Sequence, residues 1–178
     1  TLWHSSAASD VYKRQVDGYS SNKVGGSRAA HWMLLETAFS SLTTQQGNGL
    51  WLTHNEHPLI NQTGRATLKN ARENGIFIFR ANRASDILQA LAFSQQHSLN
   101  AVISGGQEAW IVREELVASG TPVVINALDN LPGSFDGLGA RLDNAALLHE
   151  AGIPLLFTSG ETHNARKLRQ VAGNAVAN

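Results

Sequence analysis

Short apolar runs alternate with longer amphipathic stretches along most of this chain. A short apolar run between turn residues is typical of a buried strand, and apolar residues at helical spacing are typical of a helix. The predicted strands are residues 76–79, 101–103, 123–125 and 155–157. The predicted helices are residues 27–42, 63–74, 85–96, 107–119, 140–151 and 163 onward. This alternation predicts an α/β fold with a parallel sheet.

Three of the predicted helices carry an apolar stripe, which is the face a helix turns toward a core. In residues 27–42 the stripe is Ala30, Met33, Leu34, Ala38 and Leu42. In residues 85–96 it is Ile87, Leu88, Leu91 and Ala92. In residues 140–151 it is Leu142, Ala145, Ala146 and His149.

One sequence motif occurs twice, each time between a predicted helix and a predicted strand. Residues 119–126 read Ser-Gly-Thr-Pro-Val-Val-Ile-Asn, and residues 151–158, which begin 32 positions later, read Ala-Gly-Ile-Pro-Leu-Leu-Phe-Thr. In each copy a glycine stands where a helix can end in the left-handed conformation, and a proline prevents the helix from continuing. The apolar run that follows ends in a polar residue. Each copy therefore predicts a helix that leads into a buried parallel strand.

Four βα units make half of a (β/α)8 barrel or most of a small doubly wound sheet, and the periodicity does not distinguish the two. Residues 1–15 resemble a translated sequencing adapter or a disordered tail, so we exclude them from the fold. Residues 175–178 lie inside a predicted helix. Because both ends look cut, we expect residues 16–178 to form a partial (β/α)8 TIM barrel, with four parallel βα units preceded by helices.

The composition is that of a single globular domain. The chain has 178 residues, of which 42% are hydrophobic and 16% are charged, and its formal net charge is zero. Because no basic stripe is present, nucleic acid is not an expected partner. No apolar run approaches the roughly 20 residues of a membrane-spanning helix, so a membrane is not expected either. The absence of cysteine excludes disulfides and thiolate zinc sites, and it is compatible with a cytoplasmic or a periplasmic location.

Polar residues follow each predicted strand, and in α/β proteins this edge of the sheet carries the chemistry. Arg80 and Asn82 follow the first predicted strand, and Asn126, Asp129 and Asn130 follow the third. We predict that these five residues bind a small-molecule substrate. The guanidinium of Arg80 is the group that would hold a carboxylate or another anion.

Two structural alternatives stay open for this edge. Arg80 would instead form an ion pair with Asp86, Asp129 or Glu161. Residues 126–139 form a connection longer than the usual ~2–6 residues of a βα loop. This loop is either functional or packed on itself, with Asx turns at its Asn and Asp residues.

Glu161 and His163 follow the fourth predicted strand and are the predicted catalytic residues. A carboxylate and an imidazole at a strand end can exchange protons or bind a metal. The alternative is an ordinary helix start, in which the helix dipole favours the carboxylate of Glu161.

Five segments of the chain together carry a family resemblance. They are Gly25-Gly26-Ser27-Arg28-Ala29, Arg83-Ala84-Ser85-Asp86-Ile87, Asp129-Asn130-Leu131-Pro132, the segment from Leu138-Gly139-Ala140-Arg141 to Leu142-Asp143-Asn144-Ala145, and the segment from Thr162-His163-Asn164-Ala165-Arg166 to Ala177-Asn178. In this order they resemble the amidohydrolase superfamily, and most closely its imidazolonepropionase-like metal-dependent hydrolases. The resemblance extends over roughly residues 24–178.

The resemblance implies a (β/α)8 barrel flanked by a small β-sandwich, of which this chain would be the C-terminal half. The implied partners are a small-molecule substrate and the missing N-terminal half, and a homo-oligomer is also compatible with it. Members of the family use one or two divalent metals, often zinc, to activate water that attacks a cyclic amide or a related non-peptide C–N bond.

The resemblance does not identify the metal ligands in this chain. In the family, two strand ends carry a histidine and another carries an aspartate. The matching places here read Phe79-Arg80-Ala81-Asn82-Arg83, Ser104-Gly105-Gly106 and Phe157-Thr158-Ser159-Gly160. The resemblance therefore favours a zinc-dependent hydrolase, and the residues favour an alternative, a metal-free barrel with a binding or scaffold role.

Overall fold

The structure, a computed structural model, describes residues 13–15, 27–43, 60, 62–159 and 162–177. It contains a five-stranded sheet in which each strand pairs in parallel with the next along the chain, in the order β1-β2-β3-β4-β5. The strands are β1 (Lys13–Gln15), β2 (Phe77–Ala81), β3 (Ala101–Gly105), β4 (Val123–Ile125) and β5 (Leu155–Phe157). A doubly wound sheet reverses its strand order at a switch point, whereas a barrel keeps chain order. The fold is that of a partial (β/α)8 barrel, as predicted.

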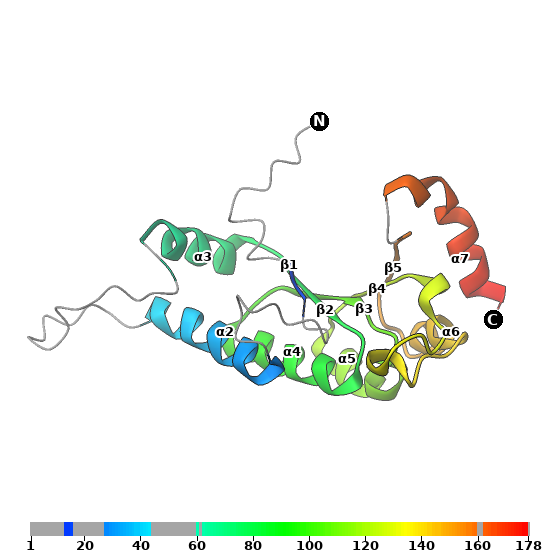
Figure 1. Cartoon of the computed structure of the whole chain (residues 1–178), viewed down its shortest axis with the longest axis horizontal. Coiled ribbons are helices and arrows are strands. Elements are labelled where there is room, and N and C mark those ends of the chain that lie inside the picture. Colours follow the sequence, from blue (N-terminus) through cyan, green and yellow to red (C-terminus); the bar gives the residue numbers. More distant parts are fainter. Residues whose placement is uncertain (1–12, 16–26, 44–59, 61, 160–161, 178) are drawn as a thin grey trace, which may run out of the picture.

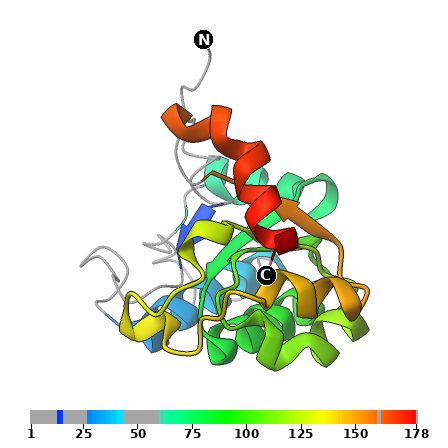
Figure 2. The same ribbon diagram turned by 90° about the vertical axis from the view of Figure 1, so that its right-hand side faces the viewer.

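Helices cover one face of the sheet and flank its two ends (Figure 1). They are α2 (Arg28–Thr43), α3 (Gln62–Asn74), α4 (Ala84–His97), α5 (Arg113–Ser119), α6 (Asn144–Glu150) and α7 (Leu168–Ala177), with short 3₁₀ turns at Ala109–Val112, Ala127–Asp129, Phe135–Gly137 and Thr162–Lys167. Figure 1 shows α2, α4 and α5 below the sheet. Figure 2 shows α7 passing above α6, with which it is in contact. Right-handed crossovers between neighbouring parallel strands place successive helices on one face.

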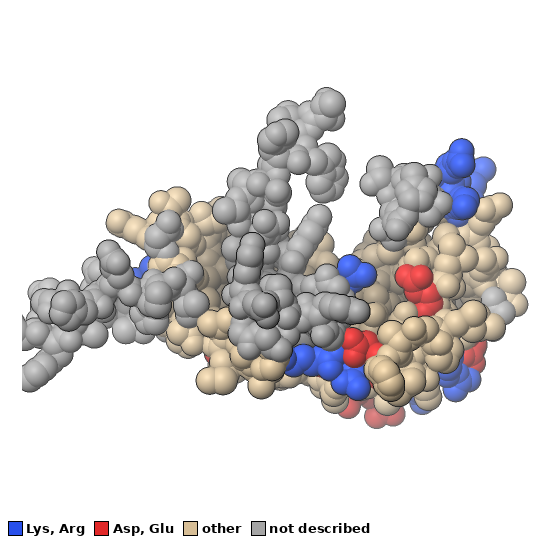
Figure 3. Space-filling view, in the orientation of Figure 1, with Lys and Arg blue, Asp and Glu red and all other residues tan. Residues whose placement is uncertain are grey.

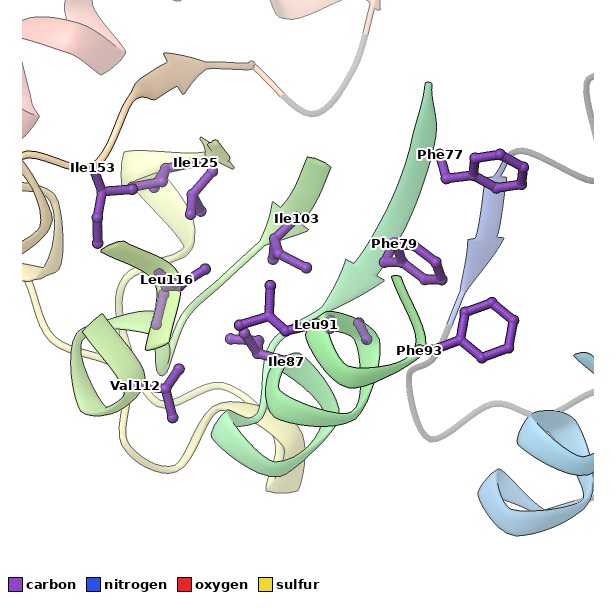
Figure 4. Packing of buried hydrophobic residues seen from close by; sticks show 14 of the residues in the cluster. Phe77, Phe79, Ile87, Leu91, Phe93, Ile103, Val112, Leu116, Ile125 and Ile153 are labelled. Atoms are coloured by element: carbon purple, nitrogen blue, oxygen red, sulfur yellow. The ribbon is translucent and has the colours of Figure 1, made fainter. Parts of the chain in front are cut away.

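The burial of alternate residues along strand β2 distinguishes the two faces of the sheet. Phe77, Phe79 and Ala81 are buried, whereas Ile78 is half-buried and Arg80 is exposed. Because successive side chains of a strand point to opposite faces, Arg80 points away from the helices α2 and α4. Figure 4 shows the rings of Phe77 and Phe79 on the same side as the buried residues of α4.

The core lies between the sheet and the helices α2, α4 and α5 (Figure 4). From α4, Ile87 and Leu91 pack beneath Ile103 of β3, and from α5 Leu116 packs toward Ile125 of β4. Four of these five side chains have no exposed surface, the exception being Leu91 at 8%. This apolar layer, on the helix side of the sheet, fixes the strands and therefore the positions of their carboxyl ends.

The stripe predicted for helix α2 is wrong in part: Ala38 and Leu42 pack against the core, but the most buried side chains come from residues outside the stripe. Trp32 stacks on Phe79 with ring centroids 6.3 Å apart, and Phe39 meets Phe93 edge to face at 5.1 Å. Met33, which belongs to the predicted stripe, is 70% exposed. The aromatic residues bury more apolar area than the Met and Ala residues, and they therefore determine which face turns inward.

The stripes predicted for α4 and α6 are also wrong in part. In α4, Ile87 and Leu91 are buried, but Leu88 is 39% exposed. Helix α6 begins at Asn144, later than predicted, so that Leu142 lies outside it and is 49% exposed. The buried residues of α6 are Asn144, Ala145 and Leu148, whereas His149 is exposed.

The first strand differs from the prediction that residues 1–15 take no part in the fold. Lys13–Gln15 form β1 and pair in parallel with residues 78–80 of β2. The segment before it lies outside the described residues. A three-residue strand of Lys, Arg and Gln has no apolar run, so the hydrophobic pattern could not predict it.

The face of the sheet that carries Arg80 is less buried than the helix face. Val102 and Val124 are half-buried there, and Leu156 is 53% exposed. Ser104 pairs in register with Arg80 on one side and with Val124 on the other, and Val124 pairs with Leu156. One row of side chains therefore runs across this face from β2 to β5.

Charges of both signs are mixed on the surface. Figure 3 shows acidic and basic side chains next to each other below the sheet, and a small group of basic side chains at the upper right. Within the described ranges, none of the helices combines the length and apolar character that crossing a membrane requires.

Truncating a side chain should destabilise the fold by different amounts on the two faces of the sheet. Ile103→Ala removes a side chain with no exposed surface, and we expect it to lower the free energy of unfolding by about 2–5 kcal/mol. Leu156→Ala, the matched control on the other face, should cost less than about 1 kcal/mol. Urea denaturation followed by circular dichroism measures both, and equal losses would contradict this assignment of the two faces.

Candidate functional site

The carboxyl ends of β2 to β5 lie at one edge of the sheet, which we call the rim. Backbone hydrogen bonds join β2 to β3 and β4 to β5 at these ends. Gly106 N–H donates to the carbonyl of Ala81 at 2.8 Å, and Thr158 N–H donates to the carbonyl of Ile125 at 2.9 Å. Parallel strands in chain order therefore bring together polar residues that are far apart in the sequence.

Arg80 lies near the carboxyl end of β2 and is exposed on the face opposite the aromatic core. Its Cα partner in β3 is Ser104. A guanidinium in this place can bind a carboxylate through two parallel hydrogen bonds. Asp86, one of the alternative ion-pair partners, forms an ion pair with Arg28, with 3.2 Å between Nε and the carboxylate.

Asn126 and Asp129 bind each other at the end of β4. The amide of Asn126 donates to the Asp129 carboxylate at 2.8 Å and accepts from the Leu128 N–H at 3.3 Å. This is the Asx turn considered as the alternative for the loop after β4. Asp129 is exposed and Asn126 is half-buried, so both can still be reached from the rim.

Asn130 lies in the interior and not at the surface of the rim. It is 1% exposed, and among the described residues neither polar atom of its amide has a hydrogen-bond partner. Helix α7 packs against the 3₁₀ turn Ala127–Asp129 directly before it. A ligand at the rim surface would therefore meet Asn126 and Asp129 before Asn130.

Asn82 follows β2 and is half-buried. Its carbonyl accepts from the Glu108 N–H at 2.9 Å, which ties it to the segment after β3. Glu161 lies outside the described residues. His163 belongs to the turn Thr162–Lys167 after β5, and the position of its side chain is not described. The predicted catalytic pair stays a prediction.

The described residues do not fit a metal site of the predicted kind. Among them, no group of three or more His, Cys, Asp or Glu residues lies close enough to hold a metal ion. The end of β2 carries Arg80, whose positive charge would repel a cation. The end of β3 carries Ser104 and Gly105, and neither is a typical zinc ligand.

A network of ion pairs joins α2 to the loop between β4 and α6. Arg28 donates to the Asp136 carboxylate at 2.6 Å and also contacts Asp86, whose side chain is 7% exposed. The guanidinium of Arg83 lies 3.5 Å from the same Asp136 oxygen. Two cations and two anions therefore balance each other beside the rim, and the loop carrying Asp136 is anchored.

A second cluster of charge lies where the same loop reaches α6. The guanidinium of Arg141 lies 4.8 Å from the centre of the Trp110 ring, which is within cation–π range. Its Nε donates to the Asp143 carboxylate at 2.7 Å. This hydrogen bond lowers the pKa of Asp143 and raises the pKa of Arg141 relative to their ordinary values.

The chain is similar in structure to a known hydrolase. It matches the crystal structure of an amidohydrolase from Thermotoga maritima MSB8 with a TM-score of 0.71 and 14% sequence identity. The match covers 93% of this chain and 45% of that chain. No protein-family model matches the sequence, and no curated protein matches it either. The chain has an amidohydrolase-like fold and spans less than half the length of that amidohydrolase.

Gly106, at the rim, has a backbone conformation that the packing requires. Its φ is +62°, and a Cβ added to it would lie 2.9 Å from Cγ1 of Val123. Gly120, with φ +64°, has no heavy atom of the described residues within 4 Å of an added Cβ. The two glycines therefore share a left-handed backbone conformation, which would strain any other residue, and differ in the space around them.

This difference makes a matched pair of substitutions. Gly120→Ala should cost about 1–2 kcal/mol, the price of a left-handed alanine. Gly106→Ala should cost about 1–3 kcal/mol more, because the methyl group also displaces the Val123 side chain in a packed core. Chemical denaturation measures both values, and a Gly106 variant as stable as the Gly120 variant would show that the rim is less tightly packed than described.

Proposed function

We propose that this chain is the substrate-binding half of an amidohydrolase-like barrel that acts on a non-peptide C–N bond of a small anionic molecule. The observation that supports this is the strand order, which gathers the carboxyl ends of β2 to β5 on one rim, with Arg80 exposed on the open face of the sheet. Rims of this kind hold the active sites of (β/α)8 enzymes.

The proposed substrate is a cyclic amide that carries a carboxylate. Arg80 would bind the carboxylate, and Asn126 and Asp129 would offer hydrogen bonds to the ring from the neighbouring end of β4. We propose a cyclic amide because of the resemblance to imidazolonepropionase-like enzymes, and we propose an anionic group because Arg80 is positively charged. The two lines of reasoning are independent of each other.

The divalent metal of the family does not fit the described rim. We therefore assign substrate binding to this half and no step of the reaction to a metal. We propose that the groups which activate water lie in the part of an amidohydrolase barrel that this chain does not match. That part would also cover Leu156 and Val124 on the open face of the sheet, because parallel sheets are normally covered on both faces.

A second candidate is a barrel without catalysis that only binds the small molecule. The observation that favours it is the presence of Arg80 and Ser104 at two strand ends where the family carries metal ligands. The two candidates share the ligand and differ in turnover. Release of a ring-opened product distinguishes them.

Binding is tested with 5-oxoproline, a cyclic amide that carries a carboxylate. Titration calorimetry should show saturable binding, and Arg80→Ala should weaken it about tenfold or more, since a charge-assisted hydrogen bond contributes about 1.5–3 kcal/mol. Arg113→Ala on the exposed side of α5 is the control and should leave the affinity unchanged. Equal affinities of the two variants would exclude Arg80 from the site.

Metal content provides a separate test. The purified chain, after exposure to zinc and manganese and removal of excess ions, should retain less than one metal ion per chain. A chelator should leave its Tm unchanged, because removing an ion stabilises or destabilises the chain only if that ion was bound. Stoichiometric metal that is lost in Glu161→Ala or His163→Ala would contradict the assignment and restore a metal site at the end of β5.

A further inference from the structure

Gln107 and Glu108, the residues that follow β3, lie between the two groups of candidate ligand residues. The Nε2 group of Gln107 donates to the carbonyl of Asp129 at 2.7 Å. The N–H of Glu108 donates to the carbonyl of Asn82 at 2.9 Å. One short segment therefore binds the end of β2 on one side and the end of the β4 turn on the other.

The carboxylate of Glu108 uses both of its oxygens to bind backbone N–H groups. One oxygen accepts from Ala84 at 3.0 Å, and the other accepts from Gly139 at 2.9 Å. Ala84 is the first residue of α4, and its cap residue Arg83 makes no side-chain capping bond. Glu108 therefore caps α4 from a different part of the chain, where an anion is also favoured by the helix dipole.

The other partner, Gly139, belongs to the long loop between β4 and α6. Trp110 Nε1 donates to its carbonyl at 2.8 Å, so both polar groups of this peptide unit are bound by the segment after β3. A Cβ added to Gly139 would lie 3.2 Å from Cγ and Oε1 of Glu108. The loop approaches Glu108 as closely as a glycine allows.

We infer that Glu108 is a positioning residue that holds the start of α4, directly after β2, against the far end of the loop that follows β4. Together with Gln107, which binds the carbonyl of Asp129, it would keep Arg80 and Asp129 facing one ligand. This inference rests on the proposed function. Both oxygens already accept backbone hydrogen bonds, so the role of Glu108 is to hold the rim and not to contact the substrate. Without the carboxylate, the start of α4 and the loop at Gly139 lose their shared partner.

Hydrogen exchange of backbone amides tests the positioning itself. In Glu108→Gln the side chain keeps one acceptor and places an amide donor against the other N–H. We expect exchange at Ala84 and Gly139 to become about tenfold faster relative to core amides such as Ile103, because one hydrogen bond to a charged group is lost. Glu114→Gln, an exposed substitution on α5, is the control and should leave all these rates unchanged.

A second variant keeps the test decisive if removal of the carboxylate prevents folding. Gly139→Ala retains Glu108 and pushes the loop away from it, so exchange should rise at Gly139 and much less at Ala84, which keeps its partner. If either variant raises exchange equally at all amides, or at none, Glu108 does not hold the rim locally and the inference is wrong.

Binding of 5-oxoproline to the same variants separates this inference from the proposed function. We expect Glu108→Gln to weaken binding several-fold with Arg80 intact. If the unsubstituted chain does not bind the probe but Ala84 and Gly139 loosen as expected, the proposed function fails and Glu108 still holds the rim. If the unsubstituted chain binds 5-oxoproline and Glu108→Gln, with faster exchange at Ala84 and Gly139, binds it equally well, the rim does not need Glu108 and the inference is overturned.

Discussion

The burial of Phe79 between α2 and α4 determines the orientation of everything at the rim. Trp32 and Phe93 contact its ring from the two helices, which fixes the face of β2 that turns inward. Arg80 must then point to the opposite face, beside Ser104. A shift of β2 by one residue would place a guanidinium among aromatic rings, at a large desolvation cost. The same contacts thus stabilise the core and present the charge.

Sequence reasoning could predict the succession of strands and helices better than the faces they bury. The four apolar runs were confirmed as β2 to β5, because a buried strand needs a continuous apolar segment whatever its neighbours are. The inward face of α2 was predicted only in part. Met33 and Trp32 are both apolar, and only the aromatic surface of β2 and α4 shows that Trp32 packs inside. The edge strand β1 was missed because its side chains are polar.

The candidate site could be located from sequence, but its internal contacts could not. Polar residues after apolar runs placed Arg80 and Asp129 at one edge of the sheet. Asn and Asp occur both in turns and in ligand-binding sites, so the pattern left open whether the Asn126 side chain stabilises a turn or binds a ligand. The pattern also did not indicate that Asn130 is buried. Glu108 carried no sequence signal, because its partners are 24 and 31 residues away and bind it through backbone N–H groups.

Strand pairing in chain order has a consequence for how the chain assembles. Each βα unit joins its predecessor, as in a one-dimensional array, so most contacts close short stretches of chain and can form early. The bond from Arg28 to Asp136 spans a much longer stretch of chain, 108 positions. A contact that distant is entropically the hardest to reach and becomes accessible once the intervening units have stacked. We therefore expect this ion pair to form after the central units are in place, whereas the aromatic contacts of α2 with β2 and α4 do not depend on it.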